Sequence, residues 1–427
     1  MSTLPLNPMR LELQRSQPIS EPVPLSAPDV SDQDRERVDA VLRGRNLSLG
    51  PLLPAFEQAA AAAAGTRFAV AVNSGTSALH LCVKAAGLGE GDEVITTPFS
   101  FIASANCLLY EQVTPAFVDI DPLTYNIDPA QVASAIGPRT RGILPVHVFG
   151  HPCDMLTLGA LADRHNLTVI EDACEAIGAT IQGRRAGSFG DSGAFAFYPN
   201  KQITTGEGGV LVTGSEAVAR LCRSWRNQGR GEEGGWLQHE RLGYNYRLSD
   251  INCALGVGQL SRLDEILAAR KRVAAIYDDV LGGIAELVRP APSAPGTEIS
   301  WFVYVVRLQD EFRREDREAV LQFLRNEGIG CNNYFAPIHL QKFYQDRFGF
   351  QRGQFPVTER VSDRTIALPF FNALTHDQIE IVAGALQRAI DSLGRRRQRA
   401  AHPLVRELTP AAIHTRKNGL SKKQGAG

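Results

Sequence analysis

A single lysine, Lys201, stands between an aromatic segment and a glycine-rich turn in the sequence FAFYPNKQITTGEGG. Lysine condenses with carbonyl compounds, and its pKa falls readily when the amine is desolvated or placed beside other cations. A solvated lysine in a surface loop is the alternative, but the apolar and glycine-rich flanks favour an amine held in a fixed place. The sequence therefore predicts a chemically active Lys201.

Two carboxylates, Asp172 and Glu175, end the apolar stretch TVIEDACEA. The carboxyl ends of parallel strands border the ligand crevice of an open sheet, so Asp172 is expected to face a ligand. A carboxylate in that place can hold a proton on a heteroaromatic nitrogen, which a pyridinium cofactor needs in order to withdraw electrons. A helix N-cap is the alternative role for Asp172.

A third segment, NSGTSAL, follows the apolar run FAVAV and opens an apolar-periodic helix. Free N–H groups at a helix N-terminus, a glycine that permits close approach and two hydroxyls are typical of an anion site, here at Gly75, Thr76 and Ser77. An ordinary Ser/Thr cap is the alternative. The segment has neither the GxGxxG nor the GxxxxGK[ST] pattern, so it does not indicate a dinucleotide or P-loop site.

A phosphate anchor, a pyridinium-binding acid and a lysine that forms Schiff bases are together the fixtures of a pyridoxal phosphate enzyme. In their order and context they resemble the DegT/StrS family of sugar-nucleotide aminotransferases, which are pyridoxal phosphate enzymes of fold type I. The likeness runs from about residue 24 to residue 393. The stretches that carry it are NLSLGP, NSGTSALHL, GEGDEVITTPFSFIASANCLLYE, PAFVDIDPLTYNIDP, IEDACEAIGA, FYPNKQITTGEGGVLVT, LGYNYRLSDINCALGVGQL and APIHLQKFY.

This resemblance implies that Lys201 carries the internal aldimine and that Asp172 pairs with the pyridinium nitrogen. It also implies that the phosphate lies on Gly75, Thr76 and Ser77, that Phe101 stacks on the cofactor ring, and that Glu175 lies near the ring oxygen. Asn245 in GYNYRLSD matches a family asparagine that reaches the phosphate of the neighbouring subunit, which implies a homodimer with shared sites. The capping residues of this segment also fit a plain helix start.

The resemblance further implies a substrate: a nucleoside-diphosphate-linked keto-sugar that receives an amino group from a donor such as glutamate. Arg247, Tyr334 and His339 match positions that line the sugar or donor pocket in relatives, with a surface arginine or a buried structural histidine as alternatives. The later segments look most like the perosamine-synthase type, which aminates C4 of a 4-keto-6-deoxy sugar. Lys201 itself argues against the relatives that carry histidine there and dehydrate sugars.

The chain departs from the family pattern at two positions. Where the family commonly has a serine that donates to the phosphate, this chain has Ala196, so a hydrogen bond is missing or comes from another donor such as Ser192. Glu175 stands where the family often has glutamine or histidine. Two other functions remain open: a pyridoxal phosphate enzyme acting on amino acids, and a non-catalytic regulatory protein that kept the fold.

The elements that position these residues read as an α/β fold, with a mostly parallel sheet covered by helices and a smaller C-terminal α/β domain. Expected strands are 68–72, 93–97, 115–120, 142–149, 167–172, 193–198 and 209–213, and later 301–308 and one near 329. Expected helices are 76–88, 100–110, 155–165, 249–281, 314–326 and 376–393. The expected domains are a flexible arm or edge segment (1–28), a large cofactor-binding domain (29–260), a small domain (261–394) and a basic, disordered tail (395–427).

The composition of the chain limits the kinds of partner that it is expected to bind. It has 427 residues and a net charge of −1, so it offers no general electrostatic attraction to nucleic acid or to an anionic membrane. Its seven cysteines are scattered, without a CxxC pair or zinc spacing, and are expected to be reduced thiols that hold no metal. Prolines and charges interrupt the first residues before they form a signal peptide, so a cytoplasmic protein is expected.

Overall fold

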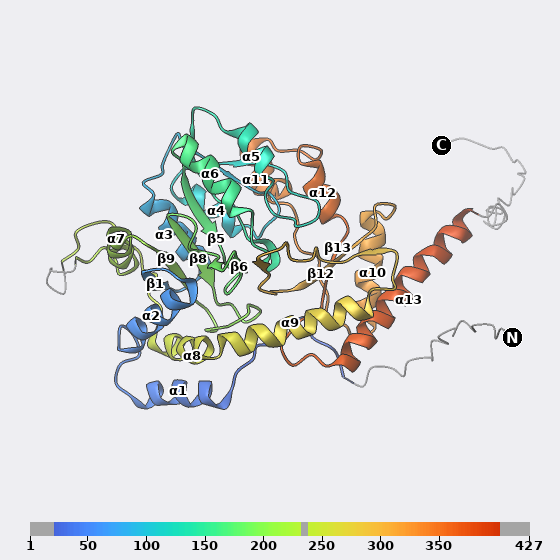
Figure 1. Ribbon diagram of the computed structural model, residues 1–427, viewed down its shortest axis with the longest axis horizontal. Coiled ribbons are helices and arrows are strands. Elements are labelled where there is room, and N and C mark those ends of the chain that lie inside the picture. Colours follow the sequence, from blue (N-terminus) through green and yellow to red (C-terminus); the bar gives the residue numbers. More distant parts are fainter. Residues whose placement is uncertain (1–20, 232–237, 402–427) are drawn as a thin grey trace, which may run out of the picture.

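The computed structural model describes residues 21–231 and 238–401, which form an α/β protein around a seven-stranded sheet (Figure 1). The strand order is β1-β9-β8-β5-β4-β2-β3. Neighbouring strands pair in parallel except at β9, which runs antiparallel to both β1 and β8. The strands are β1 (Phe68–Val72), β2 (Glu93–Thr96), β3 (Thr114–Phe117), β4 (Thr140–Ile143), β5 (Thr168–Asp172), β8 (Ser192–Ala196) and β9 (Gly209–Thr213). The predicted mostly parallel sheet is therefore confirmed, although β3 and β4 end earlier than expected.

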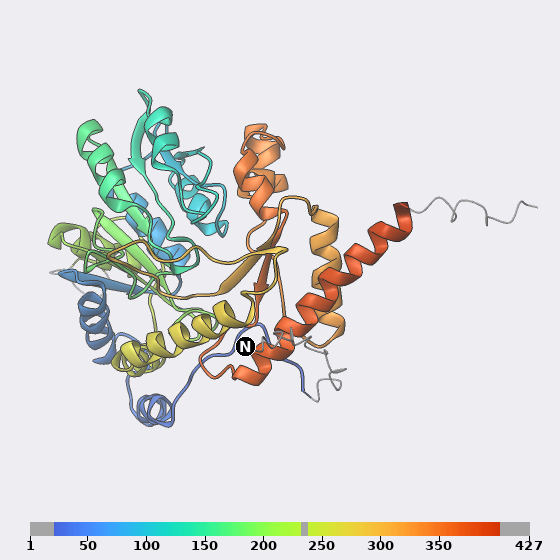
Figure 2. The same cartoon turned by 45° about the vertical axis from the view of Figure 1, so that its right-hand side comes forward.

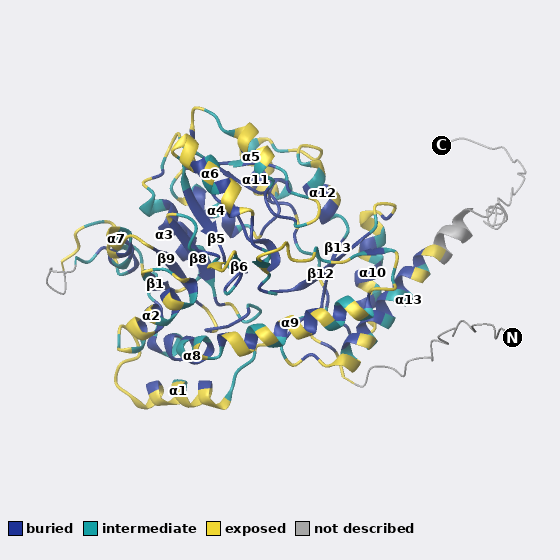
Figure 3. Cartoon of the chain, in the orientation of Figure 1, coloured by how far each residue is buried: buried dark blue, intermediate teal, exposed yellow. Residues whose placement is uncertain are grey.

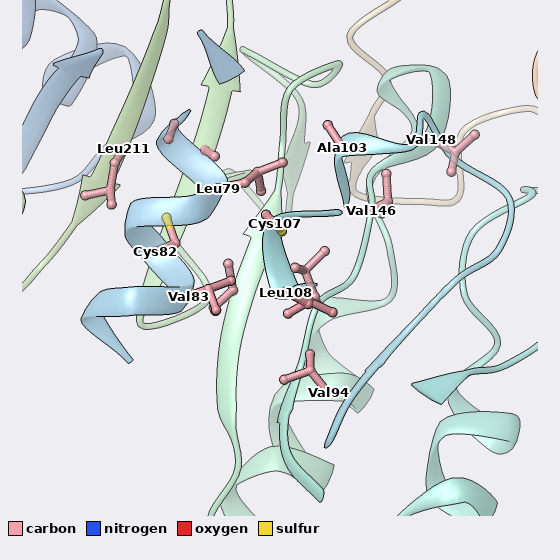
Figure 4. Close-up of a cluster of buried hydrophobic side chains, with 14 of the residues drawn as sticks. Leu79, Cys82, Val83, Val94, Ala103, Cys107, Leu108, Val146, Val148 and Leu211 are labelled. Carbon is pink, nitrogen blue, oxygen red and sulfur yellow. The ribbon is translucent and has the colours of Figure 1, made fainter. Parts of the chain in front are cut away.

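Helices cover both faces of this sheet, and Figure 3 shows their buried sides turned toward it. Alternation along β1 explains why both faces are apolar, since Val70 and Val72 join one core cluster while Ala69 and Ala71 join another. On the face to which Val70 and Val72 point, Val83 and Leu108 lie beside Val94 of β2 (Figure 4). The helices of this part are α1 (Asp32–Arg43), α2 (Leu52–Ala64), α3 (Gly75–Ala85), α4 (Ala103–Tyr110), α5 (Pro129–Ala135), α6 (Met155–His165) and α7 (Glu216–Arg226).

The predicted long helix over 249–281 is two helices, α8 (Asp250–Ser261) and α9 (Leu263–Val280). They meet at Arg262, whose guanidinium bonds to Asp34 of α1, while the Ser261 hydroxyl bonds back to the Gly258 carbonyl. Such back-bonding by serine bends a helix. The two helices run end to end along the molecule, α8 against α1 and α2, α9 toward α13 (Figures 1 and 2). The expected domain boundary falls at this bend, and the division into two domains stays a prediction.

The second part of the chain is built on an antiparallel sheet of three short strands in the order β10-β12-β13. Its apolar cluster packs these strands against α9, α10 and α13. A small hairpin, β6 and β7, pairs with β11. The elements are β6 (Thr180–Ile181), β7 (Arg184–Arg185), β10 (Leu287–Val288), β11 (Thr297–Glu298), β12 (Tyr304–Leu308), β13 (Thr365–Leu368), α10 (Arg314–Asn326), α11 (Lys342–Phe348), α12 (Pro356–Ser362), α13 (His376–Ala401) and the 3₁₀ turns η1 (Val148–Gly150) and η2 (Ile338–Leu340).

Of the two forms expected for the N-terminal segment, residues 21–28 take the edge segment, because Val23 is buried and its N–H and carbonyl bond to Gly328 and Gly330. The strand expected near Ile329 is only an isolated parallel bridge to this segment. Helix α13 runs to Ala401, seven residues into the predicted tail. Residues 1–20 and 402–427, which hold the rest of both predictions, lie outside the described residues.

The outer edge of the sheet, β1, is closed by side chains instead of a further strand. The Ala71 N–H donates to Glu57 Oε1 at 3.0 Å, and Arg226 donates to the Ala71 carbonyl at 2.7 Å. Arg223 donates to the Ala69 carbonyl at 3.2 Å, and both arginines pair with Glu57. The Ala69 carbonyl and both polar groups of Ala71 are therefore hydrogen-bonded, and the Glu57 carboxylate is paired with two guanidinium groups.

Within the described residues, no helix combines the length and the apolar character that crossing a bilayer requires.

Candidate active site

A cavity of about 460 Å³ lies at the carboxyl ends of the central strands, beside the N-termini of α3 and α4. Parallel strands bring their carboxyl ends to one side of a sheet, which is why the loops after β1, β2, β5 and β8 meet here. The segments around Phe302 and Phe335 close the cavity from the second part of the chain. Seven of the residues singled out in the sequence line it: Gly75, Thr76, Phe101, Asp172, Glu175, Lys201 and Tyr334.

Lys201 presents its amine to this cavity from a loop that is tied to the sheet. The Lys201 N–H donates to the Tyr198 carbonyl, and the backbone of Phe197 pairs with Gly208 and Thr205 on the far side of the turn. The Nζ atom lies 3.4 Å from Glu175 Oε1 and 4.0 Å from the centre of the Phe302 ring. The amine is thus held between a carboxylate and an aromatic face.

Asp172 ends β5 and is 5% exposed. Its Oδ2 accepts a hydrogen bond from the Ser104 hydroxyl at 2.6 Å, and its Oδ1 accepts one from the Cys174 N–H at 3.1 Å. The hydroxyl of Ser100 lies 2.6 Å from that of Ser104 and supports it. These bonds fix the orientation of the carboxylate toward the cavity.

Glu175 is the second buried carboxyl of the cavity. Its Oε2 accepts the Phe149 N–H at 2.9 Å, while Oε1 faces Lys201. Burial raises the pKa of this carboxyl, and the positive charge of Lys201 opposes part of that rise. The structure therefore pairs the unusual carboxylate with the lysine amine.

The N-terminus of α3 forms the other end of the cavity. Ser74 caps the helix by accepting the Ser77 N–H, while the Ser77 hydroxyl donates to Asn73 at 2.7 Å. In the described part of the chain, the N–H groups of Gly75 and Thr76 have no acceptor, so they are available to an anion. A Cβ on Gly75 would lie 2.6 Å from the Ala196 Cβ, which explains the glycine.

Four of the predicted site residues do not line this cavity, namely Ser77, His339, Arg247 and Asn245. His339 is fully buried against Glu359, with Nε2 at 3.0 Å from Oε1, and burial lowers its pKa. Arg247 donates to Asn227 at 3.1 Å. Asn245 is exposed, and its carbonyl lies near Asn73. Ser192, the alternative phosphate donor, is buried at the start of β8, the opposite end from the cavity.

Several lining residues were not anticipated. Ser100 and Ser104 lie four residues apart in FSFIASAN directly after a strand, a spacing that puts both hydroxyls on one side of a helix start. Asn200, beside the lysine, has a buried Oδ1 without a partner among the described residues. Phe302 comes from the second part of the chain, so no local signal could have linked it to Lys201.

The described residues contain no group of three or more His, Cys, Asp or Glu side chains arranged to hold a metal ion.

The chain is similar in sequence and in fold to known aminotransferases. The model of the DegT/DnrJ/EryC1/StrS aminotransferase family matches residues 28–387. GDP-perosamine synthase of Caulobacter vibrioides is 40% identical over 344 residues, 80% of this chain and 91% of that protein. DesV of S. venezuelae, solved in complex with a ketimine intermediate, has a TM-score of 0.80 at 34% identity, over 87% of this chain and 99% of its own. The PLP form of the putative sugar aminotransferase Spr1654 from Streptococcus pneumoniae has a TM-score of 0.83 at 25% identity, over 87% and 99% of the two chains.

Proposed function

Because the chain belongs to the DegT/DnrJ/EryC1/StrS aminotransferase family, whose members are pyridoxal phosphate-dependent enzymes, we propose that it transfers an amino group from L-glutamate to a nucleoside-diphosphate-linked keto-sugar. One observation carries this proposal. The amine of Lys201, the carboxylate of Asp172 and the two free N–H groups at the start of α3 line the same cavity.

These residues fit pyridoxal 5′-phosphate. The free N–H groups of Gly75 and Thr76 suit the phosphate, Asp172 suits the protonated ring nitrogen, and the aromatic ring of Phe101 at the cavity wall suits the face of the pyridine. The buried Oδ1 of Asn200 lacks a protein partner in the described chain, which agrees with a polar ligand in this space. When bound, the cofactor supplies an electron sink for a carbanion at the carbon that bears nitrogen.

Lys201 has two roles in this reaction. Its Nζ would hold the cofactor at rest, and its amine, once free, would act as the base that takes up and returns a proton at the carbon bearing nitrogen. Asp172 would hold the proton on the ring nitrogen. The keto-sugar is aminated by the same steps in reverse order, so both half-reactions use one site and the kinetics are ping-pong.

The substrate is proposed to be a 4-keto-6-deoxy sugar, and the product an amino-sugar for polysaccharide or glycoside biosynthesis. The 40% identity to GDP-perosamine synthase supports this choice. Tyr334 at the cavity wall would contact the sugar or the donor. Arg247 would reach the substrate only from another subunit or after its bond to Asn227 breaks.

A homodimer with shared sites is part of the proposal. Asn245 is exposed outside the cavity of its own chain, and Phe101 is 62% exposed although it lines the cavity. Both observations fit a second subunit that covers this rim and presents its own asparagine to the phosphate. The seven free thiols support a cytoplasmic protein.

Ala196→Ser is expected to strengthen cofactor binding. Ala196 lines the cavity beside Gly75, so a hydroxyl on its Cβ can donate to the phosphate. A hydrogen bond to a charged group contributes about 1.5–3 kcal/mol, which corresponds to a dissociation constant lower by about ten- to a hundredfold. Titration of cofactor-free protein with pyridoxal 5′-phosphate, followed by absorbance, measures the change. Ala40→Ser on the exposed side of α1 is the control, and equal affinity in the two variants would exclude a phosphate near Ala196.

The proposed reaction is tested by following the absorption of the cofactor through both halves. L-glutamate alone should convert the bound cofactor to its amino form, with release of 2-oxoglutarate. A panel of nucleoside-diphosphate keto-sugars should then contain at least one member that restores the original spectrum and gains an amine, detected by mass spectrometry. A cofactor band that no donor bleaches would contradict an aminotransferase, and bleaching that no keto-sugar reverses would contradict the proposed acceptor.

A further inference from the structure

The carboxyl of Glu175 has its two oxygens in different surroundings. Oε2 is fixed by the Phe149 N–H at 2.9 Å, and Oε1 points to the Lys201 amine at 3.4 Å. The Phe149 backbone is itself held, because its carbonyl accepts the Phe302 N–H. Oε2 is thus fixed by the backbone, and Oε1 is the oxygen placed to exchange a proton with Nζ.

We propose that Glu175 is the acid–base group that makes Lys201 reactive toward the aldehyde of its cofactor. The proposal rests on the proposed function, since it requires that Lys201 bind an aldehyde. It assigns a chemical step to the position where this chain differs from the glutamine or histidine expected by resemblance. An amide at this position could contact the same atoms, but it could not take up a proton.

The step balances without any other reactant. The Lys201 ammonium transfers a proton to Glu175 Oε1, and the neutral amine attacks the aldehyde carbon, forming a carbon–nitrogen bond while the carbonyl π electrons move to oxygen. A proton moves from nitrogen to that oxygen. The Glu175 carboxylic acid then protonates the hydroxyl, the carbon–oxygen bond breaks and water leaves. The products are a protonated imine and the original carboxylate, so the total charge is unchanged.

Among the groups around Lys201, Glu175 is the one placed to accept its proton. Asp172 is turned toward the Ser104 hydroxyl and the Cys174 N–H, whereas the Lys201 amine contacts Glu175. Burial raises the pKa of both the Tyr334 phenol and the Cys174 thiol, so these groups stay neutral and cannot accept. The Phe302 ring lies 4.0 Å from the amine on its other side and offers no group that could accept a proton.

The experiment measures imine formation rather than turnover. Cofactor-free wild-type protein and the isosteric variant Glu175→Gln are mixed rapidly with pyridoxal 5′-phosphate over a range of pH, and the growth of the imine absorption gives the rate. General acid–base catalysis contributes about 10²- to 10⁴-fold, so the variant should be at least about 10²-fold slower. Its rate should also lose the rise with pH that follows ionisation of Glu175 in the wild type.

Two further variants separate proton transfer from placement. Glu175→Ala leaves space for a small acid, so added formate should accelerate it toward the wild-type rate. Glu216→Gln removes an exposed carboxylate at the start of α7, outside the cavity, and should form the imine at the wild-type rate. Borohydride reduction after long incubation should find similar cofactor content in all variants, because a catalyst leaves the equilibrium unchanged.

Equal rates for wild type and Glu175→Gln would overturn the inference, as would a slow Glu175→Ala that formate does not accelerate. A slow Glu216→Gln would overturn it too, because the overall charge of the protein would then explain the effect. If the wild type itself forms no imine, the proposed function fails, and that result is distinct from an imine that forms equally well without Glu175.

Discussion

Lys201→Ala is expected to abolish imine formation and to lower the rate of amino transfer by more than about 10⁴-fold, because the covalent anchor and the proton carrier are lost together. The fold should persist, since the side chain lies in a cavity and not in the core. The measurement is the absorption of the purified variant with added cofactor, together with turnover of glutamate and the keto-sugar. Transfer at the wild-type rate would refute the assignment of Lys201.

This substitution also leaves Glu175 without its cation. The pKa of the buried carboxyl should rise further, so the variant should lose stability relative to wild type as the pH increases through that pKa, where the carboxyl must ionise. At a pH below that pKa the Glu175 carboxyl is neutral, so the variant and the wild type should differ little in stability. Thermal unfolding at two pH values measures this. Lys271→Ala, on the exposed side of α9, is the matched control and should change neither stability nor turnover.

Asp172→Ala is expected to retain some cofactor and to lower the rate of transfer by about 10²- to 10³-fold, in the range found when one preorganised electrostatic partner is removed. Without the carboxylate, the ring nitrogen no longer holds its proton and withdraws fewer electrons. The variant should still form the imine at Lys201, which is visible in its spectrum. A change confined to turnover, with the imine retained, therefore distinguishes this role from that of Lys201.

The control for this experiment is Asp163→Ala, which removes an exposed carboxylate from α6. It should transfer amino groups at the wild-type rate. If Asp172→Ala does the same, the carboxylate at the end of β5 does not contact the cofactor, and Asp172 acts only as the cap of the turn through the Cys174 N–H.

The parts of the site that could be predicted are those where local sequence dictates local structure. Apolar runs such as FAVAV form central strands, and the residues directly after them lie at the carboxyl edge. For that reason Gly75, Asp172 and Lys201 were found as candidates from sequence and meet in one cavity. The glycine is required by the close approach of Ala196, a reason that appears only when two strand ends are placed side by side.

The features of the site that the sequence does not predict depend on contacts between distant segments. His339 looks like a pocket residue in sequence, but its partner Glu359 lies twenty residues further on and holds it in the interior. Phe302 reaches the lysine from the segment just before β12, and the side chains of Arg247 and Asn227 meet across a loop. No local period or motif encodes such pairs, because tertiary packing selects them.

The closure of β1 by Glu57, Arg223 and Arg226 has a consequence for how copies of this chain can associate. A strand edge with free backbone groups is a template to which other molecules can add without limit, and proteins that must remain in solution at high concentration have to block it. Here the blocking groups are three charged side chains on two helices. Addition of a strand from another molecule is thereby blocked at β1, so fibre-like growth from this edge is prevented.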